Sequence, residues 1–232
     1  MTGHLLVTGA SGRVGSAVVS ACHRQGVAVS AYHHIMKLDS VDWSPVTHVV
    51  NCAAVLPGPT VPTPSFWDGN VAFIERMLPH LEGRHVVHFG TTSVFYRVGP
   101  YQVSKMLGEA LLKENEACFA SLAVVNVPSL GVEDLVQELV KRANSGALPT
   151  VDRLRFNTCT PEEVARHVVD TYGLGGTSTL TVAECDLFET VQALAHGPIV
   201  EGRAIDRRCR VDGWRITNSE ARESFEKLFG VG

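Results

Sequence analysis

Tyr101 and Lys105 are the residues of this sequence whose types and spacing best suit acid–base chemistry. They stand four positions apart, and the segment that follows is rich in helix formers, so both side chains should share one helical face. An ammonium group beside a phenol favours the phenolate and brings the tyrosine pKa toward neutrality. Such a tyrosine can give a proton to a substrate oxygen or take one from it.

A hydroxyl group that could hold this oxygen lies upstream, on Thr91, Thr92 or Ser93. The spacing Tyr-x-x-x-Lys also arises by chance. The alternative interpretation is a solvated helix face on which the lysine stem lies along apolar surface. The choice between the two depends on whether the chain also provides a cofactor.

The N-terminus predicts a site for such a cofactor. An apolar run from His4 to Thr8 leads into a glycine-rich turn and then into a helical pattern. In a dinucleotide site the first glycine allows the tight turn, the second lets the backbone approach the pyrophosphate, and the third lets the helix pack on the strand. The diphosphate lies at the positive end of the helix. The alternative is a purely structural strand-turn-helix. The cofactor contacts expected from this turn are Gly9, Ser11, Gly12, Arg13, Val14 and Gly15.

The second strand, expected at Val27–Tyr32, bears on which dinucleotide is bound. NAD sites usually carry an acidic residue at the end of this strand, and here a tyrosine and two histidines, His33 and His34, stand there. With Arg13 in the turn and Lys37 nearby, the sequence favours NADP over NAD, although Lys37 could equally be an exposed loop residue. We expect His33 and Asp39 at the adenosine end of the cofactor.

Strands and helices alternate through the next part of the chain, which predicts a Rossmann-like, doubly wound parallel sheet of the α/β class. The third strand should end at Asn51, Ala53 and Ala54, where small residues let the nicotinamide ribose approach the backbone. The stretch from His33 to Pro45 is too short for two helical crossovers, so this half of the fold should be trimmed. Further elements are expected as strands at Thr47–Ala54, Arg84–Phe89 and Phe119–Val127, and as helices at Ser65–Leu81 and Tyr101–Asn115.

We predict an NAD(P)-binding core over residues 1–127 and, over residues 128–232, mainly a small substrate-binding lobe above the carboxyl edge of the sheet, with room for one strand or helix to return to the core. The second part is less regular in sequence. Its expected elements are helices at about Val132–Asn144, Pro161–Tyr172, Asp186–Ala195 and Asn218–Leu228, and a short strand at Thr179–Val182.

Composition narrows the possible functions. The chain has 232 residues, 45% of them hydrophobic, and a net charge of −4 with both signs scattered, which argues against nucleic acid or an anionic membrane as partner. No apolar run suggests a membrane span, so we expect a soluble cytoplasmic protein. The six cysteines and ten histidines lack the spacing of a zinc site or a disulfide framework, so we expect no metal.

Five motifs in order, running from the glycine turn to the tyrosine–lysine pair, resemble the short-chain dehydrogenase/reductase superfamily. Their order and spacing are similar to its extended branch, the NAD-dependent epimerase/dehydratase group, and especially to dTDP-4-dehydrorhamnose reductase-like members. The resemblance covers the whole chain. The segments that carry it are Thr8–Gly15, Asn51–Ala54, Asn70–Val71, Thr91–Phe95 and Tyr101–Lys105, with Asn126–Gly131 and Asn157–Ala165 in support.

The resemblance implies that Tyr101 is the proton donor or acceptor, that Lys105 assists it and contacts the nicotinamide ribose, and that Thr91 holds the substrate oxygen. It also implies that Asn51, Ala53 and Ala54 line the cofactor. Two departures stand out, because the family's hydroxyl residue usually precedes the tyrosine by more than twenty positions and Asn126 stands where an arginine is often found. Both point to a smaller substrate or a more open site than a nucleotide sugar requires.

We therefore expect an NAD(P)-dependent oxidoreductase that acts on a carbonyl or hydroxyl carbon of a small metabolite or sugar derivative, and that forms a homodimer if it associates at all. The nearest alternative is an epimerase or dehydratase that retains NAD, although no acidic residue stands beside Thr91 to serve it. A dinucleotide-binding regulator without catalysis is the alternative of another class. Retention of both Tyr101 and Lys105 argues against it.

Overall fold

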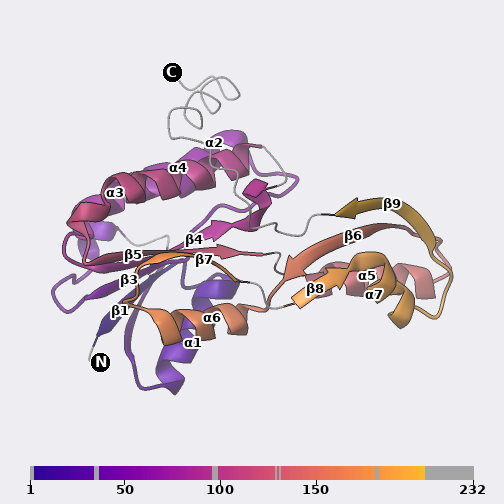
Figure 1. Ribbon diagram of the computed structural model, residues 1–232, viewed down its shortest axis with the longest axis horizontal. Coiled ribbons are helices and arrows are strands. Elements are labelled where there is room, and N and C mark those ends of the chain that lie inside the picture. The colour runs from indigo at the N-terminus through magenta and orange to yellow at the C-terminus, as the bar shows by residue number, and fades with distance from the viewer. Residues whose placement is uncertain are drawn as a thin grey trace.

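A single parallel sheet organises the N-terminal part of the molecule (Figure 1). The computed structural model describes residues 3–33, 37–95, 99–128, 130, 132–180 and 183–206. The sheet has six strands in the order β2-β1-β3-β4-β5-β7, and all neighbours are parallel. The predicted α/β fold is confirmed. Its strands are β1 (His4–Thr8), β2 (Ala28–Tyr32), β3 (His48–Asn51), β4 (His85–Thr91), β5 (Ser121–Val127) and β7 (Gly176–Thr179).

Helices cover both faces of this sheet (Figure 1). On one face lie α1 (Arg13–Arg24) and α6 (Pro161–Thr171), which pack against each other. A capping box starts α6, since the Thr160 side chain accepts from the Glu163 amide and the Glu163 carboxylate accepts in return. The other face carries one long helical stretch followed by a second helix. These are α2 (Thr63–Trp67), the π-helix η2 (Asp68–Ala72), α3 (Phe73–Met77), the 3-10 turn η3 (Leu78–His80) and α4 (Pro100–Glu114).

The strands are apolar on both faces because helices cover both sides, as parallel sheets require. Leu5, Val7 and Val87 face α1 and α6, while Leu6 and Val86 face the helices on the opposite side. Buried polar side chains, among them Thr8 and Asn51, stand where β1 and β3 reach their carboxyl ends. That edge is therefore where a ligand site is expected.

The crossover between β2 and β3 is short, as the sequence predicted. Among its described residues the only helical element is the 3-10 turn η1 (Leu38–Ser40). Strand β2 consequently forms the edge of the main sheet, and it is paired with β1 alone.

A second, three-stranded sheet in the order β8-β6-β9 extends to one side of the main body (Figure 1). Two helices pack on it through Val136, Leu139, Phe188 and Val191. Its elements are α5 (Val132–Asn144), β6 (Thr150–Thr158), β8 (Ala183–Asp186), α7 (Leu187–Leu194) and β9 (Val200–Asp206).

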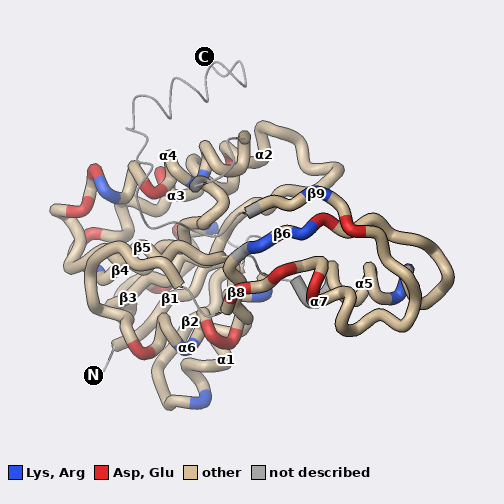
Figure 2. The backbone as a smooth tube through the Cα atoms, turned by 45° about the vertical axis from the view of Figure 1, so that its right-hand side comes forward, with Lys and Arg blue, Asp and Glu red and all other residues tan. Residues whose placement is uncertain are grey.

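Strands β6, β8 and β9 were not predicted from the sequence, because arginines and acidic residues interrupt their apolar pattern. The structure pairs these charges across neighbouring strands (Figure 2). Arg153 Nε lies 3.3 Å from Glu201 Oε1, and Arg155 Nε lies 3.2 Å from Asp186 Oδ2. Because the partners lie far apart in the sequence, the sequence alone did not predict these ion pairs. The last sheet strand was also misplaced, since β7 covers Gly176–Thr179 rather than Thr179–Val182. The helix expected at 218–228 lies outside the described residues.

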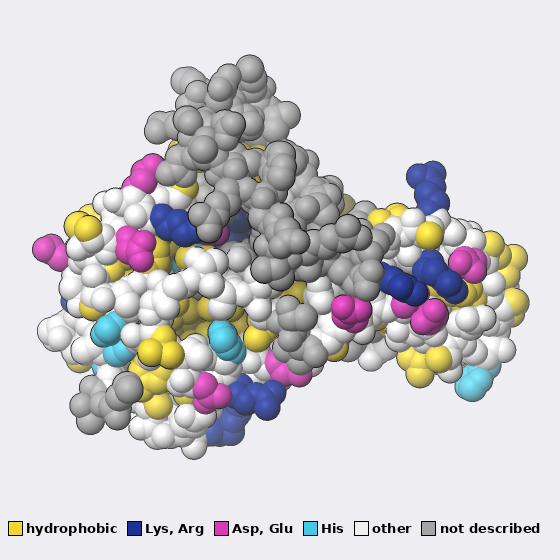
Figure 3. All heavy atoms as spheres, viewed as in Figure 1, with side chains coloured by type: hydrophobic (Ala, Val, Ile, Leu, Met, Phe, Trp, Pro, Cys, Tyr) yellow, Lys and Arg dark blue, Asp and Glu magenta, His cyan; other side chains and the backbone are white. Residues whose placement is uncertain are grey.

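Acidic and basic side chains are interspersed over the face of the molecule shown in Figure 3. Within the part of the chain that the structure describes, no helix combines the length and apolarity that crossing a membrane requires.

Candidate functional site

The glycine turn between β1 and α1 is packed too tightly for side chains at two of its positions. Gly9 has φ +62°, and a Cβ there would lie 2.7 Å from the backbone nitrogen of Ala53. A Cβ on Gly15 would overlap the carbonyl oxygen of Gly9. The Gly12 amide donates to that same oxygen at 2.9 Å and closes the turn. The turn thus brings the first residues of α1 against the end of β3.

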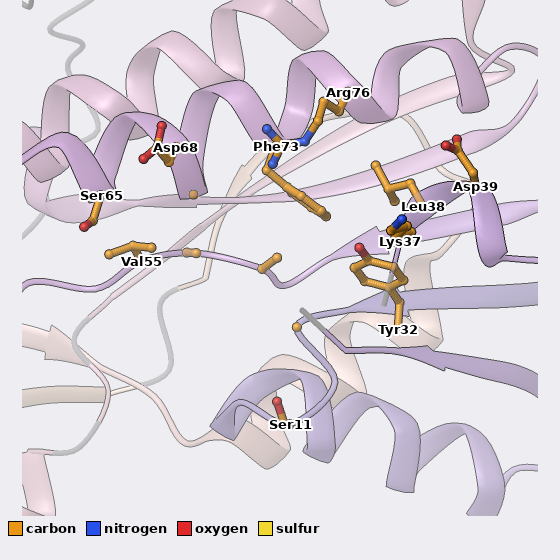
Figure 4. Close-up of a pocket in the computed structure, with 14 residues that line it drawn as sticks. Ser11, Tyr32, Lys37, Leu38, Asp39, Val55, Ser65, Asp68, Phe73 and Arg76 are labelled. Atoms are coloured by element: carbon orange, nitrogen blue, oxygen red, sulfur yellow. The ribbon is translucent and has the colours of Figure 1, made fainter. Parts of the chain in front are cut away.

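An elongated cavity of about 750 Å³ opens directly beside this turn (Figure 4). The glycine turn contributes Gly9 and Ser11 to its wall, and the chain after β3 contributes Ala53, Ala54 and Val55. The remaining lining residues, from β2, the following loop and the long helical stretch, are Tyr32, Lys37, Leu38, Asp39, Ser65, Asp68, Gly69, Phe73 and Arg76.

One end of the cavity combines apolar side chains with two cations. Tyr32, Lys37 and Leu38 lie together on one side of this end, and Phe73 and Arg76 of α3 lie on the other (Figure 4). Burial raises the pKa of the Tyr32 phenol, and the positive charge of Arg76 acts in the opposite direction. This end suits a flat aromatic group that carries a nearby negative charge.

A chain of hydrogen bonds runs across the strand ends beneath the cavity. The Ala53 amide donates to Thr8 Oγ1 at 3.3 Å, Thr8 Oγ1 donates to Asn51 Oδ1 at 2.7 Å, and Asn51 Nδ2 lies 3.1 Å from His88 Nδ1. His88 is fully buried, and that burial, with the charge of Lys105 second, holds its pKa well below the usual range. His88 is therefore neutral, and Asn51 is held by the protein rather than exposed to a ligand.

Lys105 lies on α4 over this polar layer and is only 5% exposed. Burial lowers the pKa of Lys105 to about 8, and the carboxylate of Glu109, one turn further along the helix, counteracts part of the effect. The lysine is thus a cation that is held out of water at the carboxyl edge of the sheet. Such a group is poised to lose or share its proton near neutral pH.

The π-helix joins the cavity wall to α4. Its Asn70 accepts from the Val55 amide at 2.7 Å and donates to the Val55 carbonyl at 3.1 Å. Asn70 Nδ2 also donates to Ser104 Oγ at 2.9 Å, and Ser104 donates to the Tyr101 carbonyl at 2.8 Å. A wide π turn at a functional site is a recurrent feature, and here it lets one amide tie three segments together.

Tyr101 stands in the first turn of α4, beside the Ser65 end of the cavity. Its ring meets that of Phe66 edge-on, with centroids 6.1 Å apart. Thr91 ends β4, and its Oγ1 lies 3.0 Å from Ser93 Oγ. Gln102 donates to the same Ser93 oxygen at 3.1 Å. Thr91 and the start of the Tyr101 helix are therefore linked by side chains, despite the short connection between them.

No protein-family model and no curated protein sequence matches this chain. Solved structures do match it. UDP-glucuronic acid 4-epimerase from Bacillus cereus in complex with NAD aligns at a TM-score of 0.71 and 13% identity, covering 97% of this chain and 99% of that one. dTDP-4-dehydrorhamnose reductase from Bacillus anthracis in complex with NADP aligns at 0.71 and 14% identity, covering 98% and 99%.

A short-chain dehydrogenase/reductase superfamily protein from Agrobacterium tumefaciens with bound NAD aligns at a TM-score of 0.70 and 16% identity, covering 97% of this chain and 96% of that one. The chain has the short-chain dehydrogenase/reductase fold. The predicted resemblance is confirmed at the level of the fold, over nearly the whole chain.

Within this short-chain dehydrogenase/reductase fold, the predicted site residues fall into three groups. Those that line the cavity are Gly9, Ser11, Asp39, Ala53 and Ala54. Those that do not line it are Gly12, Val14, Gly15, His33, Asn51, Thr91, Tyr101 and Lys105. Arg13 instead lines a separate groove of about 650 Å³ with Arg24 and the start of α6. His34 lies outside the described residues, and the roles of all these residues in binding and catalysis stay predictions.

Sequence reasoning missed Arg76, Phe73, His88 and Gln102. Arg76 and Phe73 come from a helix more than thirty residues beyond the second strand, so local motifs could not connect them with the adenosine end. The available signal was His88, which interrupts the apolar run Val86–Phe89 and pairs with Asn51 at the carboxyl end of β3. A buried polar side chain near the carboxyl end of a parallel strand faces the ligand edge.

Proposed function

We propose that this protein is an NAD(P)-dependent oxidoreductase that transfers a hydride between the nicotinamide and a carbonyl or hydroxyl carbon. The observation that carries the proposal is Lys105, a buried cation one helical turn after Tyr101, at the same edge of the sheet as the glycine turn. A regulator without catalysis gains nothing from holding an ammonium group out of water at this edge of the sheet. A proton-transfer site does, because the cation stabilises the phenolate.

The cavity fits a dinucleotide. Gly9 and Ser11 offer backbone amides and a hydroxyl at the start of α1, where a diphosphate is favoured. The wall formed by Ala53 and Ala54 leaves room for a ribose beside the backbone. The adenine would lie against Tyr32 and Phe73, whose ring centroids are 6.0 Å apart. The elongated shape runs from this adenine end toward Ser65 and so toward the Tyr101 helix (Figure 4).

We propose NADP as the preferred form of the cofactor. Strand β2 ends at Tyr32 rather than at an acidic residue, and the two cations Lys37 and Arg76 line the same end of the cavity. Asp39, the acidic residue nearby, has a side chain that is 93% exposed and lies 3.9 Å from His80. A phosphate on the adenosine ribose would meet two positive charges there.

The bound nicotinamide would supply the hydride. Tyr101 would give its phenolic proton to the carbonyl oxygen during reduction, or take the proton of the alcohol during oxidation. Lys105 would stabilise the phenolate that forms. Thr91 would donate a hydrogen bond to the same oxygen and so fix the carbonyl in place. Neutral His88 places no competing positive charge beside Lys105.

We propose a small carbonyl metabolite or sugar derivative as substrate. Solved structures with the same fold include UDP-glucuronic acid 4-epimerase and dTDP-4-dehydrorhamnose reductase. In this chain Asn126 lies over Gly90, where a Cβ would overlap its Oδ1, so this position offers an amide and no cation for a diphosphate. Thr91 has a hydroxyl neighbour rather than a carboxylate, which favours reduction over epimerisation with retained NAD.

The decisive experiment compares Tyr101→Phe with wild type in NADPH oxidation, using dTDP-4-dehydrorhamnose and diacetyl as carbonyl probes. We expect turnover to be abolished while the affinity for NADPH is nearly unchanged, because only the proton donor is lost. Tyr172→Phe is the matched control, since Tyr172 packs against His48 at the opposite edge of the sheet. Wild-type turnover in Tyr101→Phe would contradict the mechanism.

A further inference from the structure

Gln102 is a polar side chain that the proposed mechanism does not use, yet it is buried. It is 5% exposed in the first turn of α4, directly after Tyr101. Its Nε2 donates to Ser93 Oγ at 3.1 Å, and Ser93 Oγ lies 3.0 Å from Thr91 Oγ1. The Ser93 backbone amide also donates to Thr91 Oγ1 at 3.3 Å. Three side chains thus form one row that ends on the hydroxyl assigned to the substrate oxygen.

The direction of this row follows from the number of protons each group can give. A hydroxyl donates once and accepts twice. Since Ser93 Oγ accepts from the Gln102 amide, its own proton is available for Thr91 Oγ1. Thr91 then accepts from both the hydroxyl and the backbone amide of Ser93. Both of its lone pairs are used, so its own proton is left for an acceptor outside this row.

The opposite direction leaves the Ser93 proton without an acceptor in the part of the chain that the structure describes. If Thr91 donated to Ser93, Ser93 would accept from Thr91 and Gln102 together. Among the described residues, no other acceptor lies within hydrogen-bonding distance of Ser93 Oγ. Because the buried Gln102 amide donates to Ser93, the favoured arrangement is the one in which Ser93 donates to Thr91 and Thr91 donates to a group outside the row.

We propose that Gln102 and Ser93 are positioning residues that make the Thr91 hydroxyl an obligate hydrogen-bond donor to the substrate's carbonyl oxygen. This inference rests on the proposed function. It also gives the short connection between β4 and α4 a specific role, because the Ser93–Gln102 contact joins its two ends. Alignment of a donor before the substrate arrives is the kind of preorganisation that stabilises a developing negative charge.

Gln102→Glu tests the direction. A carboxylate at position 102 can only accept, so Ser93 would donate to it and would draw the Thr91 proton away from the substrate. We expect NADPH oxidation with diacetyl or dTDP-4-dehydrorhamnose to fall about 100-fold at neutral pH. It should recover as the pH drops and the carboxyl gains a proton, because a carboxylic acid again donates to Ser93. The affinity for NADPH should stay within about twofold of wild type.

Gln25→Glu is the matched control, since it adds the same charge at an exposed position after α1 and should leave both the rate and its pH dependence unchanged. Ser93→Ala should lose activity as Gln102→Glu does, and Ser93→Thr should retain most of it because the hydroxyl is kept. Full activity of Gln102→Glu at neutral pH would overturn the inference. A loss of activity that acidification does not reverse would also overturn it. Such a loss would point to misfolding, which does not depend on the protonation of a carboxyl group at position 102.

A neutron structure of the deuterium-exchanged protein tests the same row without turnover. We expect the deuterium between the two hydroxyl oxygens to belong to Ser93. A deuterium that belongs to Thr91 would overturn the inference. A wild-type protein that oxidises NADPH with neither probe would instead contradict the proposed function and leave the neutron result to decide on the row.

Discussion

Gly15 packs against Gly9 so closely that a Cβ on Gly15 would lie 2.8 Å from the Gly9 carbonyl carbon. Backbone cannot give way as a flexible side chain can, so Gly15→Ala should open the turn. We expect a loss of about 1 to 3 kcal/mol in the free energy of unfolding and a marked loss of NADPH affinity. Gly58→Ala is the control, because its Cβ would make only an ordinary contact, 3.4 Å from a methyl group of Val61. Denaturant melts and NADPH titrations would measure both effects, and equal behaviour of the two variants would contradict this reasoning.

Removal of the Lys105 ammonium should separate activity from stability. Lys105→Met keeps the aliphatic stem in a buried position, so the free energy of unfolding should not fall, while turnover drops about 100-fold. In wild type the rate should decline as the pH rises through about 8, because Lys105 then loses its proton. Lys141→Met, on the surface of α5, should change neither property. A wild-type rate that stays constant well above pH 8 would contradict the role of the ammonium.

Cofactor preference should depend on Lys37 and Arg76. Replacing either by Met is expected to raise the Kd for NADPH about tenfold and to leave the Kd for NADH nearly unchanged, because only NADPH carries the ribose phosphate. Arg24→Met removes a cation from the other groove and serves as control. Fluorescence titration of the four proteins with both cofactors measures the ratio. Tighter binding of NADH than NADPH by wild type would refute the preference itself.

Acid should destabilise the fold through His48. Its ring stacks on His85 with centroids 4.5 Å apart and meets Tyr172 edge-on, and burial followed by the charge of His85 lowers its pKa to about 4. The unfolded chain takes up a proton near pH 6.5, but the folded chain does so only near 4. Stability is therefore full above 6.5 and falls with decreasing pH down to about 4, by up to about 3 kcal/mol.

His48→Phe should flatten the pH dependence of the free energy of unfolding across that window, and His196→Gln, at an exposed position, should not. An unchanged slope in His48→Phe would assign the acid sensitivity to other groups.

The sequence predicted the main sheet well because its signals are local. A strand, a glycine turn and a helix lie next to each other at residues 4–24, and β3, β4 and β5 each contain an apolar run because helices cover both faces. The second sheet was not predicted because its signals are not local. Arg153 and Arg155 pair with carboxylates that are more than thirty residues away in the sequence. Bounds also shifted where polar residues complete a strand, as at Thr91.

The candidate site was likewise predictable only where its residues belong to local sequence motifs. Gly9, Ser11, Ala53 and Ala54 belong to motifs and line the cavity, whereas Arg76 and Gln102 matter only through contacts that folding creates. Arg13 shows the limit of motif reasoning. It sits in the glycine turn, yet the helix directs it toward a different groove.

The crossover after β2 is short, and its only helical element among the described residues is a 3-10 turn. The cavity end beside β2 takes Phe73 and Arg76 from α3, while Tyr101 and Lys105 lie on α4. In the proposed function, coenzyme choice and proton transfer would therefore be encoded on different helices. Mutation and selection can alter one of them without disturbing the other, which makes this small chain a convenient starting point for changing coenzyme specificity in the laboratory.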